Sequence, residues 1–434
     1  MLEDMRLGIL IKAGRLVRPG KTDQPLADIY IEGGRISRIA AGMVPAAGDQ
    51  VIHAQGKMVL PGLVDLHVHM RDPGQTHKED LATGLMAAAA GGVTTVVAMP
   101  NTTPVVDCPE IAADIMERAK KEGKARLYQA GAMTMREEGK ELADIEGMAR
   151  AGVRVLSEDG KSVMNAALCR DAFRLAASLK LPIFDHCEDL TLRGNGCMND
   201  DENAVRLGLP GISNSVEDTI TARDILLALE TGARLHLCHV STRGVVSMLR
   251  YLQSLGITQI TAEACPHHFI LSSDDIPGDD PDYKMNPPLR SAKDTEAIRQ
   301  GIIDGVISVI STDHAPHAPW EKSGSMRDAA FGIIGLETSL ALSYTTLVET
   351  GSLTINQLAE RMSFRPAQIL GIEERDLREG CPADVIVVDF SEEYQIDRGS
   401  FFSKARNTPF HGRKVKGKVH YTICGGKIVY EAGR

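Results

Sequence analysis

Short apolar runs alternate with helical stretches over most of the chain. Residues 93–100 (VTTVVAMP) indicate a buried strand, and residues 108–124 (CPEIAADIMERAKKEGK) have the pattern of a helix. A second such pair follows at residues 153–160 and 164–180. This alternation predicts parallel strands that are joined by right-handed crossovers.

The alternation supplies eight candidate strands. They are VDLHVH, VTTVVAM, ARLYQAG, VRVLS, LPIFDH, RLHLCHVS, QITAEACP and GVISVISTDH. Eight strand and helix units over about 310 residues predict an α/β fold, a (β/α)8 TIM barrel with insertions.

The two ends of the chain have a different pattern, with short strands separated by turns. Pro19-Gly20 and Gly33-Gly34 are turn signals near the start, and the strand pattern returns after about residue 375. The two ends of a barrel segment lie close together, so these strands most economically form one domain. We predict a composite β-domain of residues 1–60 and 375–434 beside a barrel of residues 61–374.

Composition narrows the classes of function. A formal net charge of -10 with scattered Lys and Arg argues against a nucleic-acid partner. Eight cysteines without a C-x-x-C pair fit buried thiols in a reducing compartment. The start lacks the basic region of a signal peptide, and no apolar run is long enough for a membrane span. We expect a cytoplasmic protein that has no membrane partner.

The first barrel strand, in residues 61–73 (PGLVDLHVHMRDP), ends in chemically active residues. In an extended strand His67, His69 and Arg71 face the same side. Two imidazoles at this spacing can hold one divalent cation. A single His-x-His is more often an accident or a hydrogen-bonded core pair, so the prediction depends on the other strands.

Further candidate ligands end the other strands. Together with the first two histidines they are Asp159, His186, His239 and Asp313. Four histidines and two carboxylates exceed the needs of one tetrahedral ion, which favours two metals bridged by a carboxylate and a hydroxide. Any one of them alone could be a capping or hydrogen-bonded polar residue.

Four neighbouring residues are not expected to bind metal. Cys187 and Cys238 adjoin candidate ligands, so strand alternation should turn both thiols into the packing. His267 and His268 also lie at a strand end, but the ligand set is complete without them.

Eight motifs, in this order, carry a family resemblance: HVHMRDPG, AMPNT, SEDG, DHCED, CHVST, KMNPPLR, STDHAPHAPWEK and GIIGLET. They resemble the dihydroorotase family of the amidohydrolase superfamily, in its bacterial class with a barrel and a composite β-domain. The combination of HVHMRDPG with TDHAPH and Lys322 separates this family from its relatives. The resemblance extends to GGKIVY near the end of the chain.

The resemblance implies a hydrolase with one or two Zn²⁺ per subunit. It assigns His67 and His69 to the more buried metal, His186 and His239 to the second, Asp159 to the bridge, and Asp313 to metal binding and proton transfer. The implied reaction is the reversible cyclisation of N-carbamoyl-L-aspartate to L-dihydroorotate in pyrimidine (UMP) biosynthesis. In the hydrolytic direction a metal-bound hydroxide attacks the ring amide.

The implied substrate contacts are cationic and amide groups. Arg71, Asn101 and His317 resemble the set that fixes the substrate carboxylate, and Asn286 resembles a residue that contacts the ring. Arg71 suits a carboxylate through its planar fork. The alternative is that Arg71 only neutralises Asp72 on the neighbouring loop.

Several alternatives remain open at this point. Many relatives bridge the metals with a carboxylated lysine, and Lys161 lies two residues beyond Asp159. The chain could instead be a hydantoinase or dihydropyrimidinase, or a catalytically silent scaffold. The expected partners are a small-molecule substrate and a second copy of the chain, and association with aspartate carbamoyltransferase is a further expectation.

Overall fold

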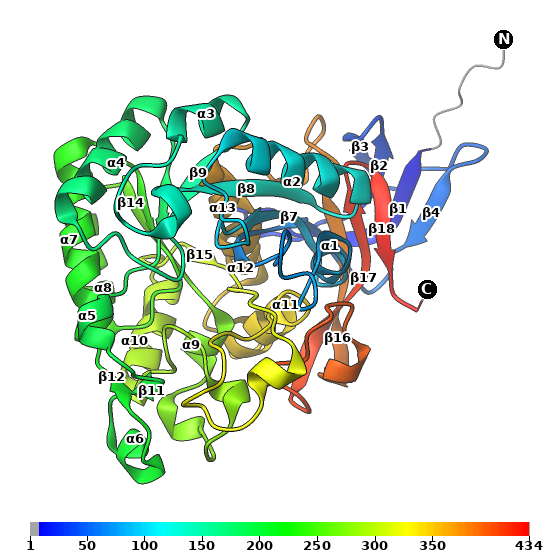
Figure 1. Ribbon diagram of the computed structural model, residues 1–434. Helices are drawn as coiled ribbons and strands as arrows, with labels where there is room; N and C mark the ends of the chain where they lie inside the picture. The colour runs from blue at the N-terminus through cyan, green and yellow to red at the C-terminus, as the bar shows by residue number, and fades with distance from the viewer. Residues whose placement is uncertain (1–7, 434) are drawn as a thin grey trace.

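A barrel of parallel strands and a separate β-sheet lie side by side in the computed structural model, which describes residues 8–433 (Figure 1). The barrel strands pair in chain order: β6 (Leu63–Val68), β7 (Val93–Ala98), β8 (Arg126–Ala132), β9 (Val155–Ser157), β10 (Ile183–Asp185), β13 (Leu235–Leu237), β14 (Ile260–Ala264) and β15 (Val309–Ile310). All eight predicted strands are confirmed, and so is the TIM-barrel class.

The ring closes beside the histidines of the first strand. A parallel bridge joins Val68 to His314, and the backbone N–H of His69 donates to the carbonyl of His314 at 2.8 Å. The strand itself differs from the expected one, because β6 ends at Val68 and its pairing with β7 is irregular between Asp65 and Val68. Such irregularities turn side chains away from simple alternation.

Helices follow most barrel strands (Figure 1). Their bounds are α1 (Leu81–Ala90), α2 (Pro109–Glu122), α3 (Ile145–Arg150), α4 (Ala166–Leu179), α5 (Leu190–Arg193), α6 (Glu202–Leu207), α7 (Ser215–Thr231), α8 (Arg243–Ser254), α9 (Pro266–Ile270), α10 (Ala292–Ile303), α11 (Ser339–Ser343), α12 (Ile355–Ala359) and α13 (Arg365–Leu370). The sequence sets their ends locally. Pro109 occupies the first turn of α2, and Gly123 ends that helix in the left-handed conformation. The side chain of Asn165 caps α4.

Apolar side chains from different strands meet in one buried cluster. Val64, Val97, Val155 and Val309 come from four strands and pack together with Leu370 of α13. Branched side chains from several strands typically fill the interior of such a barrel. The barrel is therefore a packed core, and its chemistry is confined to the strand ends.

The second sheet combines both ends of the chain, as predicted. Its order is β18 (Lys427–Glu431), β17 (Lys414–Cys424), β16 (Val385–Gln395), β5 (Met58–Pro61), β1 (Ile9–Leu16), β2 (Leu26–Glu32) and β3 (Arg35–Ala40), and β4 (Gln50–His53) pairs with β1. The antiparallel pairing of β5 with β16 joins the two chain ends. Two short strands, β11 (Met198–Asn199) and β12 (Gly211–Ile212), form a separate pair.

Within residues 8–433, no helix has both the length and the apolar composition that crossing a bilayer requires.

Candidate active site

The six predicted ligand residues lie at the carboxyl ends of five barrel strands. They are His67 and His69 at β6, Asp159 after β9, His186 after β10, His239 after β13, and Asp313 after β15. Their exposed fractions range from 0 to 6%. The carboxyl ends of barrel strands are where this fold builds active sites.

Three residues at these strand ends have a left-handed backbone. The φ angles are 57° at Arg71, 35° at His239 and 48° at Asp313. Such a conformation costs a non-glycine residue about 1–3 kcal/mol and is found mainly where function requires it. It turns each of these side chains away from the direction that a regular strand would give it.

Asp159 lies at the centre of the cluster. Its Oδ1 is 3.1 Å from Nε2 of His67, 3.8 Å from Nδ1 of His186 and 3.9 Å from Nε2 of His239. Its Oδ2 is 3.5 Å from Nε2 of His69. One carboxylate thus faces all four histidines, which is the position that a bridging ligand requires.

Three of the four histidines have an outer partner for the nitrogen that points away from Asp159. Nδ1 of His69 pairs with Oδ1 of Asn101 at 2.9 Å, and Nε2 of His186 pairs with Glu188 at 3.2 Å. Nδ1 of His67 lies 3.3 Å from Oε1 of Glu263 but without hydrogen-bond geometry. At His69 and His186 the outer acceptor holds the ring proton, so the inner nitrogen has a free lone pair, as metal-binding histidines need.

The inner atoms of His67 and Asp159 fit a cation better than they fit each other, whereas the inner nitrogens of His186 and His239 pair at 3.0 Å. Nε2 of His67 and Oδ1 of Asp159 lie 3.1 Å apart, yet within residues 8–433 neither has a partner with hydrogen-bond geometry. Burial opposes a charge on His67, but the Asp159 carboxylate raises the pKa of His67 well above its usual value. The site therefore favours positive charge here, which a metal ion would supply.

Asp313 faces the first two histidines from the segment after β15, which lies beside β6 where the barrel closes. Its Oδ1 is 3.1 Å from Nε2 of His69 and 3.6 Å from Nε2 of His67. Burial alone would raise the pKa of Asp313, but the hydrogen bond from His69 and the charge of His67 lower it. The group is a carboxylate at neutral pH, so it can accept a proton.

Arg71 and His317 lie together beside this cluster. Nη2 of Arg71 is 3.4 Å from Nε2 of His317, and Nε of Arg71 donates to the carbonyl of Pro316 at 3.2 Å. Arg71 does not neutralise Asp72, because that carboxylate accepts from Arg118 at 2.8 Å. Within the described residues Nη1 of Arg71 makes no hydrogen bond, so the guanidinium can still bind an anion.

The two predicted amide contacts are held by other side chains. Nδ2 of Asn101 donates to Oδ2 of Asp159 at 3.0 Å, so both ends of this amide contact candidate ligands. Nδ2 of Asn286 donates to Oε1 of Glu188 at 3.0 Å and lies 3.4 Å from Nε2 of His186. Both amides therefore contact a candidate ligand, and Asn286 also contacts Glu188, the partner of one.

The other residues at or near the strand ends differ in their burial and in their surroundings. Lys161 is exposed, whereas Asp159 is buried at the centre. Cys187 and Cys238 are both buried in apolar clusters, although the Cys238 thiol also lies near His67 and Glu263. His267 and His268 are buried and form a separate group with Cys265.

Sequence reasoning missed the outer partners Glu188, Glu263 and His236. Glu263 has no exposed surface and accepts from Nε2 of His236 at 3.2 Å, and Nδ1 of that ring pairs with Thr261 at 2.8 Å. Burial opposes ionisation, but His236 and His67 lower the pKa of Glu263 below its usual value. A glutamate within a buried strand was the signal, because buried glutamates are almost always paired.

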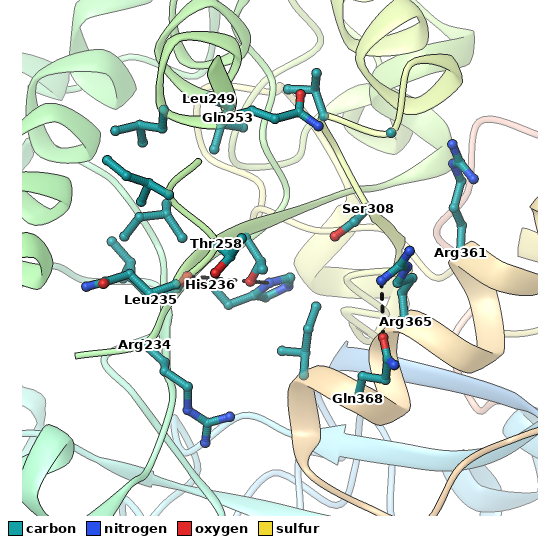
Figure 2. Close-up of a pocket in the computed structure, with 18 of the residues that line it drawn as sticks. Arg234, Leu235, His236, Leu249, Gln253, Thr258, Ser308, Arg361, Arg365 and Gln368 are labelled. Carbon is teal, nitrogen blue, oxygen red and sulfur yellow. Dashed lines mark hydrogen bonds between the residues drawn. The ribbon is translucent and has the colours of Figure 1, made fainter. Parts of the chain in front are cut away.

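A cavity of about 680 Å³ lies at the other end of the barrel (Figure 2). Arg234, Thr258 and Ser308, at the amino ends of β13, β14 and β15, line it together with Arg361 and residues of α13. Its volume is in the range of ligand sites, but the metal-ligand candidates are not among its lining residues.

Comparisons with known proteins give one consistent family. A dihydro-orotase-like family model matches residues 56–245. A dihydroorotase of Anoxybacillus flavithermus is 43% identical over 99% of this chain and 98% of its own length. One of Geotalea daltonii is 43% identical over 98% of this chain and its own full length.

Solved structures of hydantoinases share the fold. L-hydantoinase (dihydropyrimidinase) from Arthrobacter aurescens has a TM-score of 0.86 and 27% identity, covering 99% of this chain and 97% of its own. D-hydantoinase (dihydropyrimidinase) from Thermus sp. has a TM-score of 0.81 at 24% identity, covering 98% and 96%, and shows the fold alone. Because full-length relatives at 43% identity carry one name, the chain belongs to the dihydroorotase family and is a hydrolytic enzyme.

Proposed function

We propose that this chain catalyses the reversible cyclisation of N-carbamoyl-L-aspartate to L-dihydroorotate in pyrimidine biosynthesis. One observation carries the proposal: four histidines surround Asp159, Asp313 faces two of them, and a buried arginine lies beside the cluster. The histidines suit a metal-assisted attack on an amide, and the arginine suits a substrate that has a carboxylate.

The proposed metal assignment divides the four histidines into two pairs, one for each ion. We propose that His67 and His69 hold one Zn²⁺, that His186 and His239 hold a second, and that Asp159 bridges them. When bound, such ions polarise the amide carbonyl and make water more acidic. Glu263, Asn101 and Glu188 orient the imidazoles by holding their outer nitrogens.

Asp313 is the proposed proton carrier. In hydrolysis its carboxylate takes the proton of the attacking water and delivers it to the ring nitrogen that leaves. In cyclisation the same two transfers run in reverse. Oδ1 of Asp313 lies 3.1 Å from Nε2 of His69 and 3.6 Å from Nε2 of His67, so an ion held by these two nitrogens would also hold the carboxylate in position.

Arg71 is the proposed anchor for the substrate carboxylate, with His317 and Asn101 beside it and Asn286 at the ring. The hydantoinase alternative comes from the structural similarity at 27% identity. The two functions differ at this point, because dihydrouracil has no ring carboxylate for a guanidinium to bind.

The test compares two substrates with one variant. Losing one partner of a desolvated charge pair costs about 2–5 kcal/mol, so we expect Arg71→Met to lower kcat/KM on dihydroorotate by two to three orders of magnitude. Arg118→Met, which removes the partner of Asp72, is the control and should stay near wild type. Wild-type enzyme that hydrolyses dihydrouracil as well as dihydroorotate would favour the hydantoinase function.

We also propose an oligomeric state, a cellular location, a protein partner and domain boundaries. The chain forms a homodimer in the cytoplasm and associates with aspartate carbamoyltransferase, and its domains divide at residues 60/61 and 374/375. Sedimentation of the purified chain, alone and mixed with that transferase, tests both associations. A monomeric chain that does not bind the transferase would contradict them.

A further inference from the structure

A second cluster of metal-binding side chains lies outside the proposed catalytic set. Cys265 follows β14, and His267 and His268 are in the short helix α9 directly after it. One donor atom from each residue lies within 4.8 Å of the other two, and the two imidazole rings are 4.2 Å apart at an angle of 62°. The exposed fractions are 0% for Cys265 and 2% for each histidine.

Both histidines have a buried ring nitrogen without a partner among residues 8–433: Nε2 of His267 and Nδ1 of His268. The other nitrogen of His268, Nε2, donates to the carbonyl of Pro287 at 2.9 Å. A carbonyl can only accept, so it holds the ring proton on Nε2 and leaves Nδ1 with a free lone pair. Leaving such a buried polar atom unpaired is destabilising, and a bound ion would remove that penalty.

We propose that Cys265, His267 and His268 bind an additional Zn²⁺. One thiolate and two neutral imidazoles are donors that this ion accepts, and a water can fill a fourth position. Binding releases the thiol proton of Cys265 to solvent, and no other bond changes.

The ion would connect to the proposed substrate site through one hydrogen bond. His268 holds the Pro287 carbonyl, and the preceding residue, Asn286, contacts Glu188 and His186. An ion on His268 fixes α9 and thereby the segment that carries Asn286. The role is structural, and the proposal does not depend on the reaction that the enzyme catalyses.

Sulfur distinguishes this site from the proposed catalytic centre, whose ligands are nitrogen and oxygen. We would load the metal-free full-length chain with Co²⁺, as a spectroscopic substitute for Zn²⁺, and record the thiolate-to-cobalt charge-transfer band. Zn²⁺ content is measured in parallel. The wild type should show the band, and Cys265→Ser should lose both the band and one equivalent of Zn²⁺. Wild-type protein without the band overturns the proposal, even if every variant fails to fold.

Two other buried cysteines provide controls. Cys169→Ser removes a buried thiol near Asp224 and should keep the band and the metal content. Cys238→Ser tests the thiol near His67 and Glu263. A band that disappears in Cys238→Ser and persists in Cys265→Ser would assign the sulfur to the ion at His67 and overturn the proposal. Turnover of dihydroorotate is measured separately, so failure of the proposed function is distinguishable from failure of this site.

Discussion

The two ends of the barrel differ in how their buried polar groups are paired. At the carboxyl ends of the strands, His67, His239 and Asp159 have ring nitrogens or oxygens without hydrogen-bond partners in residues 8–433. At the amino ends, the guanidinium of Arg361 donates to the carbonyls of Ile302, Ile303 and Gln357, and Arg365 binds Glu360 and Gln368. Figure 2 shows the contact between Arg365 and Gln368.

The open cavity and the unpaired ligand atoms therefore lie at different ends of the barrel. The amino end has the open cavity of about 680 Å³, but its arginines are already bound by the protein. At the carboxyl end, Nε2 of His67 and Oδ1 of Asp159 are buried 3.1 Å apart, and neither has a hydrogen-bond partner in residues 8–433. Buried groups without partners indicate the ligand-binding end better than volume does, because only a ligand or an ion can compensate them.

Asp313→Asn should have the largest effect at the reactive end. Its amide can bind metal weakly but cannot carry a proton, and general acid–base catalysis contributes about 10²–10⁴-fold. We expect kcat to fall by about 1000-fold while much of the metal is retained. Steady-state kinetics and metal analysis of the same preparation check this. Near-normal turnover would remove Asp313 from the mechanism.

Asp159→Ala should release metal. Without the central carboxylate at least one ion loses a ligand, so we expect a loss of at least one equivalent of metal by elemental analysis. Lys161→Ala is the matched control, because this side chain is exposed. Metal loss in Lys161→Ala with full retention in Asp159→Ala would make the lysine the bridge.

Glu263→Gln tests an outer partner. The amide keeps the shape but loses the charge that holds His236 and Nδ1 of His67. Changes to such partners typically cost about 10–100-fold in metal affinity or activity. Competition with a chelator measures the affinity, and Glu360→Gln, at the opposite end of the barrel, should leave it unchanged.

Arg361→Met should have the smallest catalytic effect. It removes three hydrogen bonds to backbone carbonyls, of which only the one to Ile302 is fully buried, and leaving a buried acceptor unpaired costs about 1–3 kcal/mol. We expect lower stability in urea unfolding, with kcat and KM within about twofold of wild type. A large loss of kcat in folded Arg361→Met would show that the two ends are coupled, and the comparison between them would fail.

The sequence was most informative about features that depend on the local pattern of apolar and polar residues within one strand or helix. The eight barrel strands and the composite sheet follow from local alternation of strand and helix patterns, and the structure confirms them. Each of the six ligand candidates ends a predicted strand, so the fold class already implied that they meet. Their convergence on Asp159 agrees with that expectation, while their roles remain predictions.

The contacts between strands could not be predicted in the same way. Glu263 on β14 reaches His67 on β6, two strands away around the ring, and His236 on the adjacent β13, and no local pattern encodes those distances. The pairing of Asp72 with Arg118 brings together residues 46 positions apart. The expected extended strand through Arg71 was wrong, because β6 ends at Val68 and Arg71 has a φ of 57°, but His67 and His69 do face one site together with Asp313.

The left-handed backbone at Arg71, His239 and Asp313 limits how this centre could be transplanted. A graft of the six side chains onto the regular strand ends of another (β/α)8 barrel would aim His239 and Asp313 in other directions. Glycine adopts such dihedral angles freely but supplies no ligand. A designer would therefore have to copy the surrounding loops that hold the left-handed backbone conformation. Copying the side chains alone would not reproduce the site.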